Sequence, residues 1–334
     1  MSLRKHLAAL VLSCAVAGFG APALSQDPAT GSEPADLPTL QRETRPEIET
    51  LSRPSLPGWR QEINVLRIGI LAPSGTGREL LMADPFRLHM QETLGLPVEL
   101  IPARDTRALI DAIVNGRIDY ARMSASAFST GWALCRCLEP LATPQAADGT
   151  RAYHAIALAP ARSNLSRLVD LEGKAVVFSE PHSLTGYLLP VATLRAQGID
   201  TTSFFARQNH AASPRAAISA MLRGDYDVAF AWSSLAGDEA EGYSRGPLHR
   251  MVRDGALSMS DVRIVWQSDA IPHPPQVVRA NLPEDLKSLL RAALFDLLQA
   301  APEAYDAAEP AFSSGFVAIT RDDYAPLLHA FSPN

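Results

Sequence analysis

From Leu66 onward, the chain alternates short apolar runs with longer segments whose apolar residues recur at helical spacing. "LRIGILAP" at 66–73 has the length and content of a buried strand. "DTRALIDAIVNG" at 105–116 has an aspartate cap, a helical apolar period and an Asn-Gly stop. The rhythm resumes after residue 153. This alternation predicts an α/β fold with mainly parallel sheets, and ligands bound beyond the carboxyl ends of the strands.

Composition limits the function classes. With 334 residues, 47% of them hydrophobic, the chain can bury one large core or two ordinary ones. The formal net charge of -6 and the lack of a lysine or arginine block argue against nucleic acid as a partner.

Within the helical pattern at 78–95, Asp84-Pro85 predicts a break.

The first 25 residues have the pattern of an export signal. Arg4 and Lys5 precede an apolar run, and small residues before Gln26 fit cleavage at that point, so 1–25 is predicted to be a signal peptide. An alternative takes "VLSC" as a lipobox with a lipid anchor on Cys14. Either reading places the mature protein outside the cytoplasm, in the periplasm.

The segment 26–61 carries six prolines among polar residues and has no apolar period. Such a segment cannot offset its own ordering entropy by burying apolar surface. We therefore expect 26–61 to be a disordered leader that precedes the folded part of the chain.

The stretch "SEPHSLTGYLLP" at 179–190 joins a predicted strand, "AVVFS", to a helical pattern. Ser183, Thr185 and the amide of Gly186 would lie in the first helical turn, where backbone N–H groups lack internal partners and the helix dipole is positive. An oxyanion fits this position. Ordinary helix capping by Ser183 explains the same residues without any ligand.

The sequence resembles the phosphate, phosphite and phosphonate substrate-binding proteins of ABC importers, over residues 66–328. Two features match most specifically. The first is the Asp/Glu-Pro-x-Ser-x-Ser/Thr-Gly loop, which here spans Glu180 to Gly186 and is called the hydroxyl loop below. The second is a histidine before a helix, His210. In the family, the loop and the histidine hold the oxyanion. The resemblance also implies a type II periplasmic binding protein fold, with two lobes and the ligand in the cleft between them. We place lobe 1 at 62–153 plus 262–334 and lobe 2 at 154–261.

Other candidate ligand residues follow from their positions. Ser124 and Ser126 follow a predicted strand of lobe 1, where they would face the ligand or only cap the next helix. Tyr187 follows the hydroxyl loop, and Trp232 ends the strand pattern "YDVAFAW", where it would line the cleft or pack in the core. Many relatives carry an aromatic residue where this chain has Met123, so the organic side of the pocket differs from theirs.

Cys135 and Cys137 are separated by one residue. The sequence leaves three interpretations of this pair: a disulfide, a buried reduced pair or a soft-metal site. The spacing is tight for an unstrained disulfide. Because some members of the resembled family are arsenite sensors that use cysteine, the alternative function is a periplasmic ligand sensor that signals to a histidine kinase.

An enzyme is the remote alternative. Ser183 and His210 would serve as nucleophile and base of a hydrolase, but no Gly-x-Ser-x-Gly elbow, P-loop or His-x-x-x-His pattern is present. The sequence thus predicts a monomeric binding protein without cofactor or enzyme activity. It would capture a tetrahedral oxyanion (phosphate, phosphite or phosphonate) and deliver it to an ABC permease.

Overall fold

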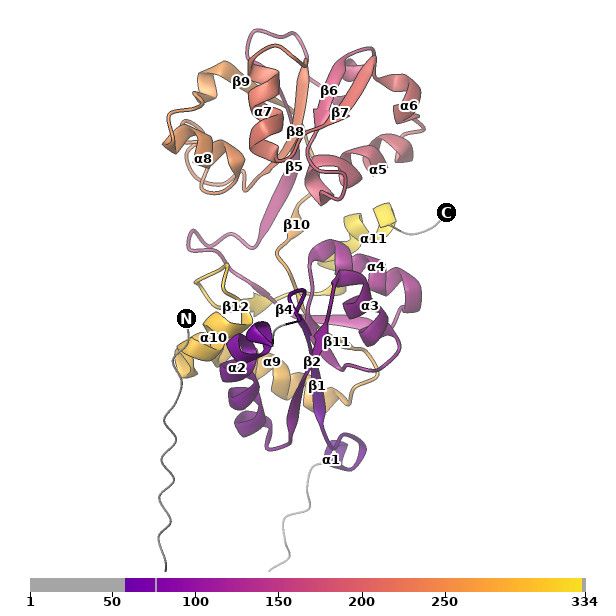
Figure 1. Cartoon of the computed structure of the whole chain (residues 1–334), viewed down its shortest axis with the longest axis vertical. Coiled ribbons are helices and arrows are strands. Elements are labelled where there is room, and N and C mark those ends of the chain that lie inside the picture. Colours follow the sequence, from indigo (N-terminus) through magenta and orange to yellow (C-terminus); the bar gives the residue numbers. More distant parts are fainter. Residues whose placement is uncertain (1–57, 76, 332–334) are drawn as a thin grey trace, which may run out of the picture. The chain divides into compact units, whose positions relative to one another are not determined.

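The computed structural model describes residues 58–75 and 77–331, whose strands form two sheets (Figure 1). The first sheet has the order β12-β4-β11-β3-β1-β2. Its strands are β1 (Leu66–Leu71), β2 (Val98–Ala103), β3 (Tyr120–Arg122), β4 (Leu138–Pro144), β11 (Gln276–Arg279) and β12 (Phe316–Ala318). The second sheet has the order β10-β5-β8-β6-β7, and β9 also pairs with β5. Its strands are β5 (Ala152–Pro160), β6 (Ala175–Phe178), β7 (Arg207–His210), β8 (Val228–Ser233), β9 (Val262–Gln267) and β10 (Ile271–Pro272).

Both sheets are mixed, so the expectation of mainly parallel sheets is wrong. The strands that alternate with helices are parallel, as predicted: β1 pairs with β2 and β3, and β6 pairs with β7 and β8. Strands β5, β9, β10, β11 and β12 pair antiparallel to their neighbours. The α/β class itself is confirmed.

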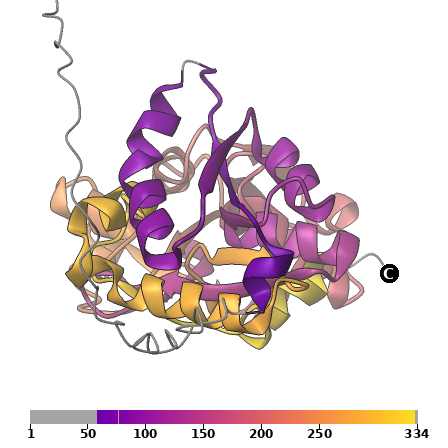
Figure 2. The same ribbon diagram turned by 90° about the horizontal axis from the view of Figure 1, so that it is seen from below.

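Helices cover both faces of the first sheet (Figure 2). Apolar side chains of α2 (Arg78–Leu94), α9 (Glu284–Ala300) and α10 (Pro302–Ala308) pack on one face. Those of α3 (Thr106–Val114), α4 (Ala125–Cys135) and α11 (Ala325–Phe331) pack on the other. Because successive side chains of a strand point to opposite faces, Tyr120 joins the first of these cores and Ala121 the second.

The second sheet is covered in the same way. On one face lies α5 (Leu189–Ala196), with the short α6 (Thr201–Phe204) next to it. On the other lie α7 (Pro214–Leu222) and α8 (Pro247–Arg253). Short 3-10 turns lie at Leu168–Leu171, Met259–Asp261 and Arg321–Tyr324. The lobe boundaries given above stay a prediction.

Helix α2 runs unbroken through Pro85, so the predicted break at this residue is wrong. A proline inside a helix removes one hydrogen bond, here to the carbonyl of Leu81, and costs about 3 kcal/mol. Leu81 lies on the exposed side of the helix, where water can solvate its carbonyl. Phe86 and Met90 are buried in the core and hold the helix on the sheet.

The predicted leader overlaps the folded part. Helix α1 (Trp59–Glu62) includes its last residues, and Trp59 is buried in the core of the first sheet, so the fold includes residues before 62. The predicted signal peptide, the Cys14 lipid anchor and residues 26–57 lie outside the described residues. None of the helices within 58–75 and 77–331 is both long and apolar enough to cross a membrane.

Candidate functional site

The hydroxyl loop lies at the carboxyl end of β6, as predicted. Ser183 caps the helix that follows, because its Oγ accepts a hydrogen bond from the backbone N–H of Gly186 at 3.1 Å. The helix begins with a π-helical turn, Leu184–Leu188, and continues directly into α5. A hydroxyl that accepts one hydrogen bond still has its own O–H to donate. Capping therefore leaves Ser183 able to bind a ligand oxygen.

Thr185 lies in the same first turn and is 5% exposed. Within the described part of the chain, its hydroxyl has no hydrogen-bond partner. The oxygen of this hydroxyl is accessible from the cavity that the residue lines, so it can donate a hydrogen bond to a ligand oxygen. The backbone N–H groups of this turn add the positive end of the helix dipole.

Ser183 and Thr185 line a cavity of about 500 Å³. Trp232, at the end of β8, also lines it, so the structure brings together three of the predicted ligand residues. The remaining walls come from Glu180 and Leu184 of the same loop, from two prolines, and from five residues that we did not predict: Tyr153, Arg245, Arg250, His273 and Phe312.

The two arginines reach the cavity through a tight backbone approach at Gly246. Its φ of 130° lies in the region that favours glycine, and a Cβ there would come within 2.9 Å of the carbonyl oxygen of Trp232. Two hydrogen bonds join Arg245 to Ser234, so the loop lies against the end of β8. Helix α8 begins at Pro247 and carries Arg250 to the same cavity.

Both guanidiniums are available to an anion. Burial lowers the pKa of Arg245, while the carboxylates of Asp148 and Glu309 oppose that shift. Arginine nonetheless stays protonated in proteins. Among residues 58–75 and 77–331, no carboxylate forms an ion pair with Arg245 or Arg250, and the Arg245 guanidinium lies 4.3 Å from the ring centroid of Phe312. The cavity is lined by these two arginines and by one carboxylate, Glu180. This excess of positive charge favours an anionic ligand.

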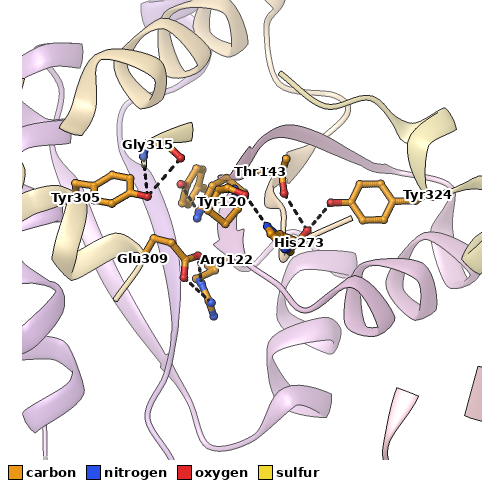
Figure 3. Close-up of polar contacts among 10 residues, drawn as sticks. Tyr120, Arg122, Thr143, His273, Tyr305, Glu309, Gly315 and Tyr324 are labelled. Atoms are coloured by element: carbon orange, nitrogen blue, oxygen red, sulfur yellow. Dashed lines mark hydrogen bonds and ion pairs between the residues drawn. The ribbon is translucent and has the colours of Figure 1, made fainter. Parts of the chain in front are cut away.

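His273 lines the cavity and is 3% exposed. Its Nδ1 donates to the carbonyl of Pro144 at 2.9 Å, and its own carbonyl accepts hydrogen bonds from Thr143 and Tyr324 (Figure 3). The pKa of His273 is lowered from 6.5 to about 4, mainly by burial and also by Arg245, while the hydrogen bond to Pro144 and the Asp148 carboxylate oppose the shift. The imidazole is therefore neutral at neutral pH and adds no charge to the cavity.

The low pKa of His273 predicts a pH dependence of stability. Because the unfolded chain binds this proton more tightly, the folded state should lose about 2 kcal/mol as the pH falls from about 7 to about 5. His273→Gln should flatten that part of the curve, measured by urea unfolding at several pH values. His329→Gln, at an exposed histidine on α11, is the control and should keep the parent slope. An unchanged slope in His273→Gln would contradict the assignment.

Four other predicted ligand residues do not line this cavity. His210 is exposed, and its Nδ1 contacts the carbonyl of Ser179 at 2.8 Å while its ring packs edge-on against Tyr187. Ser124 caps α4 by accepting from the N–H of Ala127, and its hydroxyl lies 3.2 Å from that of Ser126. None of His210, Tyr187, Ser124 or Ser126 lines the cavity. Their roles in binding stay predictions.

Gly186 lies where the packing leaves no room for a side chain. A Cβ there would come within 2.4 Å of the Ser179 side chain, whose hydroxyl donates to the carbonyl of Phe230. The glycine thus allows the helix to sit close to the ends of β6 and β8. Its amide is already bonded to Ser183, so a direct contact from this amide to the ligand also stays a prediction.

Cys135 and Cys137 form a disulfide. Arg136, between them, has a φ of 53° in the left-handed region, and this conformation brings the two Cα atoms to 5.0 Å. Because α4 ends at Cys135 and Arg136 turns the chain, the close spacing is compatible with a disulfide. With the sulfurs joined, the pair offers no thiolate to a soft metal. No group of three or more metal-ligating side chains occurs among the described residues.

A second cavity, of about 240 Å³, lies beside β1 and the start of α2. Its walls are mainly apolar, and its charged groups have partners within the chain. Arg122 forms a two-bond ion pair with Glu309, at 2.6 and 2.8 Å (Figure 3). Tyr120 donates to the side-chain carbonyl of Gln276 at 2.7 Å. The unpaired cations of the first cavity make it the better candidate for an anion site.

Comparison with known structures supports the fold. A Xanthomonas citri protein solved bound to ATP superposes with a TM-score of 0.56, covers 80% of this chain and 96% of its own, and is 20% identical. The α/β fold with two mixed sheets is that of type II periplasmic binding proteins, which confirms the predicted fold. On this fold, a hydroxyl loop and two guanidiniums that form no ion pair among the described residues line one cavity.

The family is shown by its sequence model, described as "ABC transporter, phosphonate, periplasmic substrate-binding protein", which matches residues 70–324. This chain belongs to that family. It is 27% identical to the phosphate-import protein PhnD of Mycolicibacterium smegmatis over 196 residues, 56% of this chain and 58% of the relative. It is 24% identical to the phosphonates-binding periplasmic protein of Escherichia coli over 237 residues, 68% of this chain and 64% of the relative.

The chain thus spans about three fifths of the length of these two relatives. The family is one of periplasmic substrate-binding proteins and not of enzymes, which confirms the predicted protein class.

Proposed function

We propose that this protein captures a phosphonate or phosphate oxyanion in the periplasm and delivers it to the permease of an ABC importer. The observation that carries the proposal is the meeting of two hydroxyls, Ser183 and Thr185, with two unpaired guanidiniums, Arg245 and Arg250, around one cavity. The names of the two curated relatives, a phosphate-import protein and a phosphonates-binding protein, support the same ligand class.

The chemistry of capture is noncovalent. Hydroxyl and backbone donors at a helix N-terminus suit the oxygens of a tetrahedral anion, because the dipole and the unpaired N–H groups act together. Guanidiniums add charge-assisted hydrogen bonds, which are frequently bidentate to such oxygens. Closure of the two predicted lobes over the ligand would remove competing water.

The cellular setting remains part of the proposal. We infer export by the signal peptide at 1–25 and function as a monomer, with the permease as the macromolecular partner. Sensing through a histidine kinase receives no support from Cys135 and Cys137, because their sulfurs are joined to each other.

Ligand binding should raise the stability of the mature protein. A ligand that binds only the folded state adds about 2.7 kcal/mol at a hundredfold excess over Kd. Thermal melts with phosphate, phosphite, methylphosphonate and 2-aminoethylphosphonate provide the test. Thr185→Val keeps the shape of the side chain and removes only its hydroxyl, so affinity by calorimetry should fall at least about tenfold, or 1.4 kcal/mol.

Thr193→Val is the matched control, because Thr193 lies further along the same helix and does not line the cavity. This variant should bind as the parent does. The absence of a melting shift with all four anions would refute the proposed function. Equal affinity of Thr185→Val and the parent would place the anion elsewhere.

A further inference from the structure

We propose that the ligand is an organophosphorus anion with a ring-sized apolar substituent, and not a bare oxyanion. This inference rests on the proposed function and specifies its ligand class. The cavity of about 500 Å³ is the first observation. Pockets of about 300 to 1,000 Å³ are typical of sites that enclose organic ligands, whereas a phosphate ion has only five heavy atoms. The anion donors occupy one part of this space and leave the rest for a substituent.

The second observation is a continuous wall of rings along the cavity. Trp232 packs edge-on against Tyr153 with 5.6 Å between centroids, and Tyr153 lies 6.1 Å from the ring of His273. His273 in turn contacts Phe312 at 4.3 Å, and the Arg245 guanidinium lies over Phe312. All five side chains line the same cavity. An oxyanion gains nothing from such a wall, while an apolar ring gains both burial and edge or stacking contacts.

The charge along this wall is the third observation. Burial lowers the pKa of His273 to about 4 and raises the pKa of Tyr153 to about 12, so both rings are neutral at neutral pH. Of the described residues that line the cavity, Glu180 alone is a carboxylate, and it belongs to the hydroxyl loop. The wall therefore has no counter-charge for an ammonium group. It suits an uncharged apolar substituent better than an aminoalkyl chain.

The probes for this inference are methylphosphonate and phenylphosphonate, which share the anionic group and differ in the size of the substituent. Calorimetry should show that phenylphosphonate binds at least about tenfold more tightly, because the ring is buried against the wall. In Trp232→Ala this advantage should shrink to less than about threefold, because the phenyl group loses more contact with the wall than the methyl group does.

Trp132→Ala is the matched control, since Trp132 lies on α4, outside the cavity, and the change should leave both affinities unaltered. If Trp232→Ala does not fold, Phe312→Leu tests the same wall. Equal binding of the two phosphonates by the parent would overturn the inference and leave the proposed function standing. Binding of neither would refute the proposed function itself. A phenyl preference that survives in Trp232→Ala and Phe312→Leu would also overturn the assignment of the wall.

Discussion

Replacement of Arg122 by methionine should destabilise the protein by about 3 to 5 kcal/mol, because it leaves the Glu309 carboxylate buried without a partner. The Glu309 side chain is 0% exposed, and both of its oxygens accept hydrogen bonds from Arg122. Burial raises the pKa of the neighbouring phenol of Tyr120, and the Glu309 carboxylate raises it further. Methionine keeps most of the apolar stem of the arginine, so the loss should come mainly from the charge.

Two comparisons separate this effect from a general loss of packing. Urea unfolding of Arg122→Met with Glu309→Gln should recover much of the stability, since the buried charge is then absent. Arg223→Met removes an exposed ion pair with Asp225 and should change stability by less than about 1 kcal/mol. A double variant no more stable than Arg122→Met would contradict the buried-charge explanation.

Local sequence signals predicted the elements that local interactions determine. Asp105 caps α3 and Ser183 caps the helix after β6, each as expected. These predictions succeeded because a cap depends on a side chain and an N–H group two or three residues away. Trp232 also lies at the end of a strand, as expected, and it lines the candidate cavity, because carboxyl ends of strands converge there; its contact with a ligand stays a prediction.

The residues that the sequence did not reveal depend on contacts between distant segments. Arg245 reaches the cavity only because Gly246 allows the loop to pass close to the end of β8. Phe312 belongs to a segment between α10 and β12 that has no helical or strand period. Strands β11 and β12 have only four and three residues, too few to show an alternating pattern in the sequence. One local signal could have pointed to Arg245. This arginine directly precedes Gly246 and Pro247, a pair that marks the start of a helix, and it follows the predicted strand that ends at Trp232.

Removal of both cavity arginines should cause the largest loss of affinity. Each charge-assisted hydrogen bond contributes about 1.5 to 3 kcal/mol, so Arg245→Met and Arg250→Met should each weaken oxyanion binding by roughly tenfold to a hundredfold. If both contact the same anion, the double variant should lose roughly a hundredfold to ten-thousandfold. Methionine at position 245 keeps an apolar contact with Phe312, so the wall of the cavity should remain in place.

The control for this loss is Arg253→Met, which removes an exposed arginine from the same helix as Arg250 without touching the cavity. It should bind as the parent does if local contacts, and not net charge, hold the anion. Arg245→Lys should fall between the parent and Arg245→Met, because lysine keeps the charge but lacks the planar fork. Calorimetry with methylphosphonate at two salt concentrations should also show a weaker salt dependence in the double variant, since fewer cations face the ligand. Parent-like affinity in Arg245→Met with Arg250→Met would show that the hydroxyl loop and its helix dipole bind the anion without these guanidiniums.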